Sequence, residues 1–174
     1  YSFAFENKPI WITEWNLQMS KITANTMLQA LFTASYLLEA STNPKLKSIE
    51  LTTFHNLAGR TLSASMLLKK KDKMHVLVTY MPMKMLSEIF QNKDYKANKE
   101  EIGEECFKYI YTKGDSKIIC WVNWSKKKLN AQIPLGSWMQ KDFSGKNLYS
   151  TTFDQREIRY NEKEVVNRII LKPY

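Results

Sequence analysis

The feature that most constrains the fold is a short apolar run that ends in polar residues. Residues 8–16 read KPIWITEWN, a segment rich in β-formers with Pro9 where a strand can begin. A nearly continuous apolar run of this length is typical of a parallel strand covered on both faces. Polarity rises abruptly at its carboxyl end, with Glu14 and Asn16. We expect Trp11, which alternates to the opposite side of this strand from Glu14, to pack in the core.

The next 75 or so residues predict alternating helices and strands. Helical spacing of apolar side chains indicates a long helix at 22–41, and a second strand is expected at 47–55. Pro82 suits the first turn of a second helix, over 82–90. The order strand, helix, strand, helix predicts a parallel sheet with a right-handed crossover. Two strands do not make a stable parallel sheet, so residues 1–91 are interpreted as the end of a larger α/β domain.

The pattern changes in the second half of the chain. Residues 92–104, rich in Lys, Asn and Glu, are interpreted as a linker. Short strands separated by turns follow, and the segment TKGDS at 112–116 is a hairpin signature between strands at 107–111 and 117–123. Residues 105–174 are therefore expected to form a small antiparallel β-sandwich.

Composition narrows the class of protein. Of the 174 residues, 44% are hydrophobic and 25% are charged, which favours a folded globular chain over a disordered one. The longest apolar stretches are shorter than the about 20 residues of a membrane span, and no signal peptide is visible. The chain opens at Tyr1 rather than Met, so we expect that an upstream segment has been removed or is missing.

Charge is uneven along the chain. The net charge is +9, and most of it comes from lysines after residue 60. A basic half can indicate nucleic acid, in which case the lysines of 69–73 and 126–128 should converge on one face. Base readout and bidentate phosphate contacts prefer Arg, and only three Arg follow residue 60. A lysine-rich solvated surface, with no nucleic-acid partner and no membrane partner, is the favoured interpretation.

Cys106 and Cys120 are too few for a disulfide framework and lack the spacing of a zinc site. We expect both on strands as small apolar side chains, with a single bridge between them left open. No phosphate-binding loop or metalloprotease motif is present, so no cofactor and no metal are expected.

Residues 9–16 (PIWITEWN) resemble the seventh barrel strand of retaining (β/α)8 glycoside hydrolases, a superfamily that includes α-L-arabinofuranosidases, β-xylosidases and heparanase-like enzymes. The resemblance implies that 22–41 is helix seven, that 48–55 is strand eight and that 82–90 is the last helix. Residues 122–125 (VNWS) and 169–174 resemble the central and final strands of the β-sandwich beside such barrels. The implied fold class is the terminal β/α units of a TIM barrel followed by a small antiparallel β-sandwich.

The resemblance also implies a site. Its nucleophile would be Glu14, with Trp15 stacking on a sugar and with Asn16, His55 and Asn56 lining the same cleft. A carboxylate at the end of a buried parallel strand is costly unless it is used or paired, so the alternative for Glu14 is an ion pair with Lys or Arg. The implied activity is hydrolysis of glycosidic bonds in plant-type or other polysaccharides, by a secreted, periplasmic or cell-surface enzyme.

The resembled enzymes use a second glutamate, following an Asn, as acid/base. No Asn-Glu pair precedes Glu14, and a complete barrel needs about 250 residues. The chain is therefore expected to be a fragment that is inactive alone and needs the rest of the barrel or a second copy.

Two other functions stay open. The first is a carbohydrate-binding or accessory module, in which Trp121, Trp124 and Trp138 would form a sugar platform, although core packing is the favoured role for these rings. The second is a basic nucleic-acid-binding protein.

Overall fold

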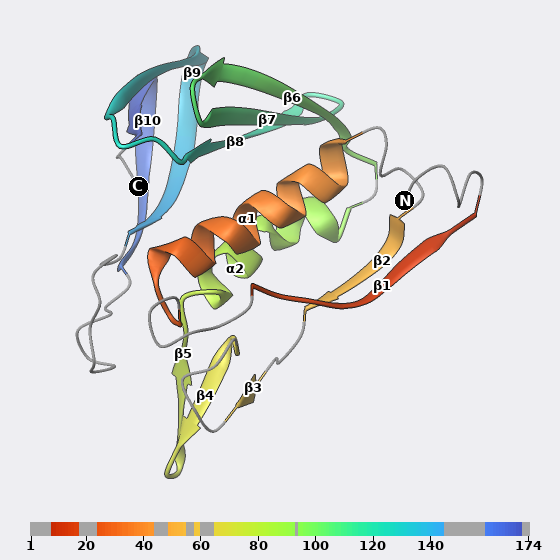
Figure 1. Cartoon of the computed structure of the whole chain (residues 1–174). Coiled ribbons are helices and arrows are strands. Elements are labelled where there is room, and N and C mark those ends of the chain that lie inside the picture. The colour runs from red at the N-terminus through yellow and green to blue at the C-terminus, as the bar shows by residue number, and fades with distance from the viewer. Residues whose placement is uncertain are drawn as a thin grey trace.

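The computed structural model describes residues 8–17, 24–43, 49–54, 58–59, 65–92, 94–144 and 159–171. Within these ranges the helices α1 (Met27–Thr42) and α2 (Tyr80–Phe90) lie side by side at the centre of the molecule (Figure 1). Strands surround them: β1 (Ile10–Trp15), β2 (Ile49–Phe54), β3 (Ala58–Gly59), β4 (Leu67–Lys70), β5 (Lys73–Val76), β6 (Lys96–Gly103), β7 (Cys106–Lys113), β8 (Ser116–Asn123), β9 (Leu129–Ser144) and β10 (Arg159–Leu171).

Strands β1 and β2 form a two-stranded parallel sheet, and α1 connects them along the chain. The pairing starts at Ile10 opposite Ile49 and ends at Trp15 opposite Phe54. The carboxyl ends of both strands therefore meet at one edge. The strands predicted at 8–16 and 47–55 and the helix predicted at 22–41 are found in the described parts of those ranges.

A second small sheet follows β2. Strand β3 pairs in parallel with β4, and β4 pairs antiparallel with β5. The β4–β5 hairpin turns at Lys71 and Asp72 and projects away from the helices (Figure 1). Helix α2 begins soon after β5, with Pro82 in its first turn as predicted.

The second half of the chain forms two antiparallel sheets, β6–β7–β8 and β9–β10. The predicted hairpin is confirmed: β7 and β8 flank a two-residue turn at Gly114 and Asp115. Strand β6 lies inside the stretch interpreted as a linker at 92–104. Its side chains are mostly exposed and charged, which is how natural sheets protect an edge strand.

The main core lies between α1 and the strands on either side of it. Trp15 of β1, Leu38 of α1, Leu86 of α2 and Tyr109 of β7 belong to one buried cluster. A smaller cluster joins β9 to β10 through Ala131, Ile133 and Ile169.

The three sandwich tryptophans pack against these clusters. Trp121 and Trp138 contact the smaller cluster and Trp124 contacts the main one. All three are half-buried, so the structure favours packing against the core over an exposed sugar platform.

The predicted fold class is wrong. The described chain is rich in strands that pair mostly antiparallel, with two helices, and it is not the end of a TIM barrel. Among the residues that the structure describes, parallel pairing is limited to β1 with β2 and β3 with β4. Helix α2 leads into an antiparallel meander rather than another parallel strand. Strand β1 is not covered on both faces, because five of its six residues are half-buried or exposed.

Both cysteines lie on strands, as expected, and both are free thiols. Cys106 is opposite Asn123, whereas Cys120 is opposite Tyr109, so the two are three positions out of register for a bridge. Burial raises the pKa of both thiols, that of Cys120 to about 12. Neither is a reactive thiolate at neutral pH.

Candidate functional site

The carboxyl end of β1 carries the residues that the sequence predicts as a site, and an irregular register orients them. Ile12 and Trp15 both pack toward the main core, although residues three apart point to opposite sides of a regular strand. A register shift between these two residues explains why both point to the same side. Ile12 is opposite Thr52 and Trp15 is opposite Phe54, so β1 has one extra residue over this interval.

The register shift places Trp11 and Glu14 on the side of β1 that faces away from α1. Each directly precedes a residue that packs toward the core, and both are exposed, Trp11 to 65%. The expectation that Trp11 packs in the core is therefore wrong. Three residues of a strand span about 10 Å, so an aromatic ring and a carboxylate lie about that far apart on one side of the strand.

Trp15 lies on the opposite side. Its side chain is 8% exposed, and its ring stacks on Tyr36 of α1 with centroids 4.0 Å apart and planes inclined by 19°. Aromatic pairs in this geometry add to the energy of burial. The Trp15 ring thus anchors β1 to α1 and holds Glu14 outward.

Asn16 ends the strand. Its side-chain oxygen accepts a hydrogen bond from the Leu17 amide at 2.8 Å, and the residue is half-buried. His55 and Asn56 lie outside the described residues. The structure therefore brings Glu14 and Asn16 to the edge where β1 and β2 both end, and the exposed Trp11 lies three residues before Glu14 on the same strand.

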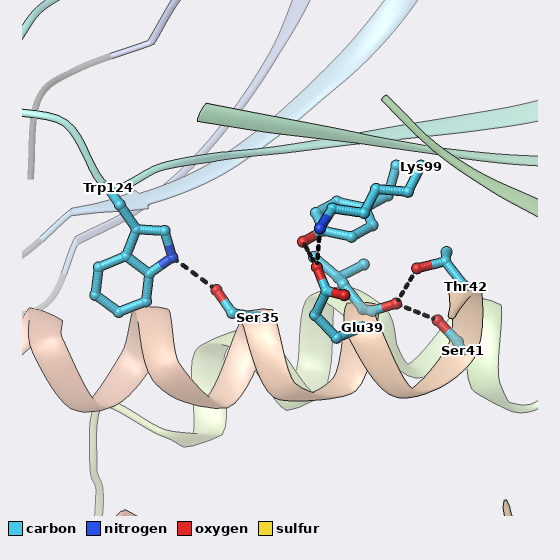
Figure 2. A network of polar contacts seen from close by, with 8 residues as sticks. Ser35, Glu39, Ser41, Thr42, Lys99 and Trp124 are labelled. Carbon is cyan, nitrogen blue, oxygen red and sulfur yellow. Dashed lines mark hydrogen bonds and ion pairs between the residues drawn. The ribbon is translucent and has the colours of Figure 1, made fainter. Parts of the chain in front are cut away.

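A second group of polar side chains joins α1 to the sheet β6–β7–β8 (Figure 2). The Glu39 carboxylate accepts a hydrogen bond from the Tyr109 hydroxyl at 2.7 Å and pairs with the Lys99 ammonium at 2.6 Å. One turn earlier on α1, the Ser35 hydroxyl accepts a hydrogen bond from the Trp124 indole N–H at 3.0 Å. Residues 35 and 39 are four apart and so share one stripe of the helix.

The C-terminal end of α1 adds a further contact to the sheet. The Ser41 and Tyr111 hydroxyls are 2.6 Å apart. Ser41 and Thr42 both donate to the Leu38 carbonyl (Figure 2). Burial raises the pKa of the Tyr111 hydroxyl. Burial and the hydrogen bond to Glu39 likewise raise the pKa of Tyr109, so this hydroxyl stays protonated and donates at neutral pH. These contacts hold the helix on the sheet.

Because Glu39 is committed to Lys99 and Tyr109, it is a structural carboxylate and not a candidate for catalysis. Its role was not predicted. The available signal was a polar stripe, Ser35 and Glu39, on a helix whose neighbouring positions are apolar.

The described residues hold no group of three or more His, Cys, Asp or Glu side chains placed to bind a metal ion. In the same part of the chain, neither helix is long and apolar enough to cross a membrane.

Comparison with known proteins does not extend these observations. No protein-family model matches the chain, and no curated protein sequence matches it. The function is therefore inferred from the residues of this chain.

Proposed function

We propose that this chain takes part in the hydrolysis of glycosidic bonds with retention of configuration, with Glu14 as the nucleophile. The proposal is supported by one observation above all, the exposed Trp11 ring and the exposed Glu14 side chain on the same side of β1. Aromatic rings contact the apolar faces of sugars, and a carboxylate can attack an anomeric carbon. A separation of about 10 Å along the strand lets the two side chains contact neighbouring units of one glycan.

In the proposed reaction, each bond that forms is matched by a bond that breaks. A Glu14 carboxylate oxygen attacks the anomeric carbon as the bond from that carbon to the leaving oxygen breaks, and the leaving oxygen takes a proton from an acid/base carboxyl group. Water then attacks the glycosyl-enzyme ester, gives its proton to the same group and frees Glu14. The acid/base group must lie about 5–5.5 Å from the nucleophile. The proposal assigns the nucleophile alone.

Two features of the fold support the position of Glu14. The stack of Trp15 on Tyr36 fixes the strand from behind, so the carboxylate is held on a rigid element. The carboxyl ends of β1 and β2 meet at one edge, which is where parallel sheets gather ligand-binding groups.

Of the other two functions considered, the carbohydrate-binding accessory module has less support. The rings that would form its sugar platform, those of Trp121, Trp124 and Trp138, pack against the two clusters.

The test is covalent trapping. The protein is incubated with a panel of 2,4-dinitrophenyl 2-deoxy-2-fluoro glycosides, whose leaving group departs without protonation, and labelled peptides are identified by mass spectrometry. The label is expected on Glu14, because an activated leaving group bypasses the acid/base residue.

Matched variants sharpen this test. E14Q should take up no label, while E88Q, which changes another exposed glutamate on α2, should be labelled like the parent protein. Labelling that persists in E14Q, or no labelling by any sugar of the panel, would show that Glu14 is not the nucleophile.

A further inference from the structure

The β4–β5 hairpin carries a concentration of positive charge that the fold does not use. Residues 69–73 read KKKDK, and the side chains of Lys69, Lys71 and Lys73 are exposed. Within the part of the chain that the structure describes, no ion pair joins these three lysines to a carboxylate. The tip therefore presents a net positive charge to solvent.

The turn of the hairpin has an unfavourable backbone conformation. Lys71 opens the two-residue turn with a φ of 55°, in the left-handed region that favours glycine. A lysine at a position where it costs stability is consistent with a role in binding.

Two contacts join the hairpin to segments that follow β1 and β2 in the chain. Asn25, which precedes α1 on the connection from β1, accepts a hydrogen bond through its side-chain oxygen from the Val78 amide at 2.8 Å, two residues after β5. On the other side, β3 pairs with β4 and begins four residues after the carboxyl end of β2. The hairpin thus lies on the side of the molecule toward which β1 and β2 run (Figure 1).

We propose that the β4–β5 hairpin binds anionic groups of a glycan, so that the substrate of the Glu14 site is a polysaccharide carrying carboxylate or sulfate groups. This inference rests on the proposed function, because it assigns the substrate class of that site. The lysines engage negative charges along the glycan while Trp11 and Glu14 engage the sugar rings near the bond that is cleaved.

The side chains of the hairpin favour a glycan over the other polyanions. Nucleic acid is bound with Arg and with aromatic rings that stack on bases, and residues 67–76 contain no Arg, Phe, Tyr or Trp. A lipid surface requires a substantial apolar face beside the lysines. The exposed apolar side chains here are Met74 and Val76, too little surface for insertion into a bilayer.

The experiment measures the affinity of the protein for sodium polygalacturonate and for dextran sulfate, with neutral dextran as the reference polymer, by isothermal titration calorimetry. Binding is compared at about 0.1 M and about 1 M salt, between which the Debye length falls from about 10 Å to about 3 Å. Binding of at least one anionic polymer, lost at high salt and absent with dextran, is expected. The polymer that binds more tightly identifies carboxylate or sulfate as the preferred group.

The decisive comparison is between two double variants of equal charge. K71E/K73E is expected to weaken binding about tenfold or more, because it reverses two charges at the hairpin tip. K126E/K128E changes the same number of charges at exposed lysines between β8 and β9 and should bind like the parent protein. Circular dichroism of both variants confirms that they fold.

Equal weakening by both variants would show attraction by net charge alone and would overturn the proposal. No binding, no effect of K71E/K73E, or tighter binding to phosphatidylserine vesicles than to either glycan would overturn it as well. Failure of the proposed function is measured separately, because the neutral fluoroglycosides would then leave Glu14 unlabelled.

Discussion

Replacing Glu39 with alanine tests the contact between α1 and the sheet β6–β7–β8. The Glu39 carboxylate accepts from the Tyr109 hydroxyl at 2.7 Å and pairs with Lys99 at 2.6 Å. Tyr109 is fully buried, so E39A leaves a hydroxyl in the core without its acceptor. We expect E39A to fold and to lower the free energy of unfolding.

The magnitude follows from the burial of each partner. A buried donor without an acceptor costs about 1–3 kcal/mol. The ion pair adds little, because the Glu39 and Lys99 side chains are 35% and 28% exposed and water screens the pair to about 0–1 kcal/mol. In E39A, Lys99 also retains its contact with the Phe107 ring, whose centroid lies 4.3 Å from the ammonium group. The expected loss is therefore about 2 kcal/mol, mostly from Tyr109.

The assay is urea unfolding followed by fluorescence and circular dichroism, with the midpoint and slope fitted for each variant. Because the loss comes from the stranded hydroxyl, Y109F should recover most of it in the E39A background, giving a coupling of about 1 kcal/mol or more. D94N provides the control, since Asp94 pairs with Lys113 at an exposed position and its loss should cost under about 0.5 kcal/mol. If E39A costs no more than D94N, or if Y109F recovers nothing, the structural role assigned to Glu39 is wrong.

Two further predictions concern pH and the β7–β8 turn. Burial raises the pKa of the Cys120 thiol from 9.0 to about 12, so the unfolded chain loses this proton at lower pH than the folded one. The stabilising contribution of the protonated thiol is therefore fully present below about pH 9 and should be lost as the pH rises toward about 12. The urea midpoint of the parent protein should fall over this window, and the fall should be smaller in C120A. A midpoint that is constant from about pH 9 to about pH 12 would contradict the assignment. Gly114 has a φ of +53° with open space around the position of a Cβ, so G114A should cost about 1 kcal/mol from the backbone alone, which unfolding by urea would detect; an unchanged midpoint would show that the turn relaxes.

Elements with strong local patterns could be predicted from the sequence. The apolar run of β1, the helical spacing of α1, and the turn between β7 and β8 each depend on residues close together in the chain, and each is found. Pro82 likewise marked the first turn of α2.

Pairing between distant segments could not be predicted. Strand β6 is rich in Lys, Glu and Asn, which favour a loop by composition, and it becomes a strand because β7 offers it hydrogen-bonding partners from Lys96 to Gly103. The fold class depended on such pairings. Two helices alternating with two strands are compatible with a barrel, and only the antiparallel meander after α2 excludes that fold here.

The candidate site shows why local alternation is a limited guide. Counting from Glu14, Trp11 should lie on the opposite side of a regular strand and pack in the core. The register shift between Ile12 and Trp15 adds one residue to β1 relative to β2. The alternation of side chains is thereby offset by one, so Glu14 lies on the same side of the strand as Trp11. The shift depends on how β1 pairs with β2, since the Trp15 backbone is opposite that of Phe54 while the Trp15 ring stacks on Tyr36 of α1. The pairing of β1 with β2 and its packing on α1 thus decide which aromatic ring lies on the side of the carboxylate, and no pattern within residues 8–16 contains that information.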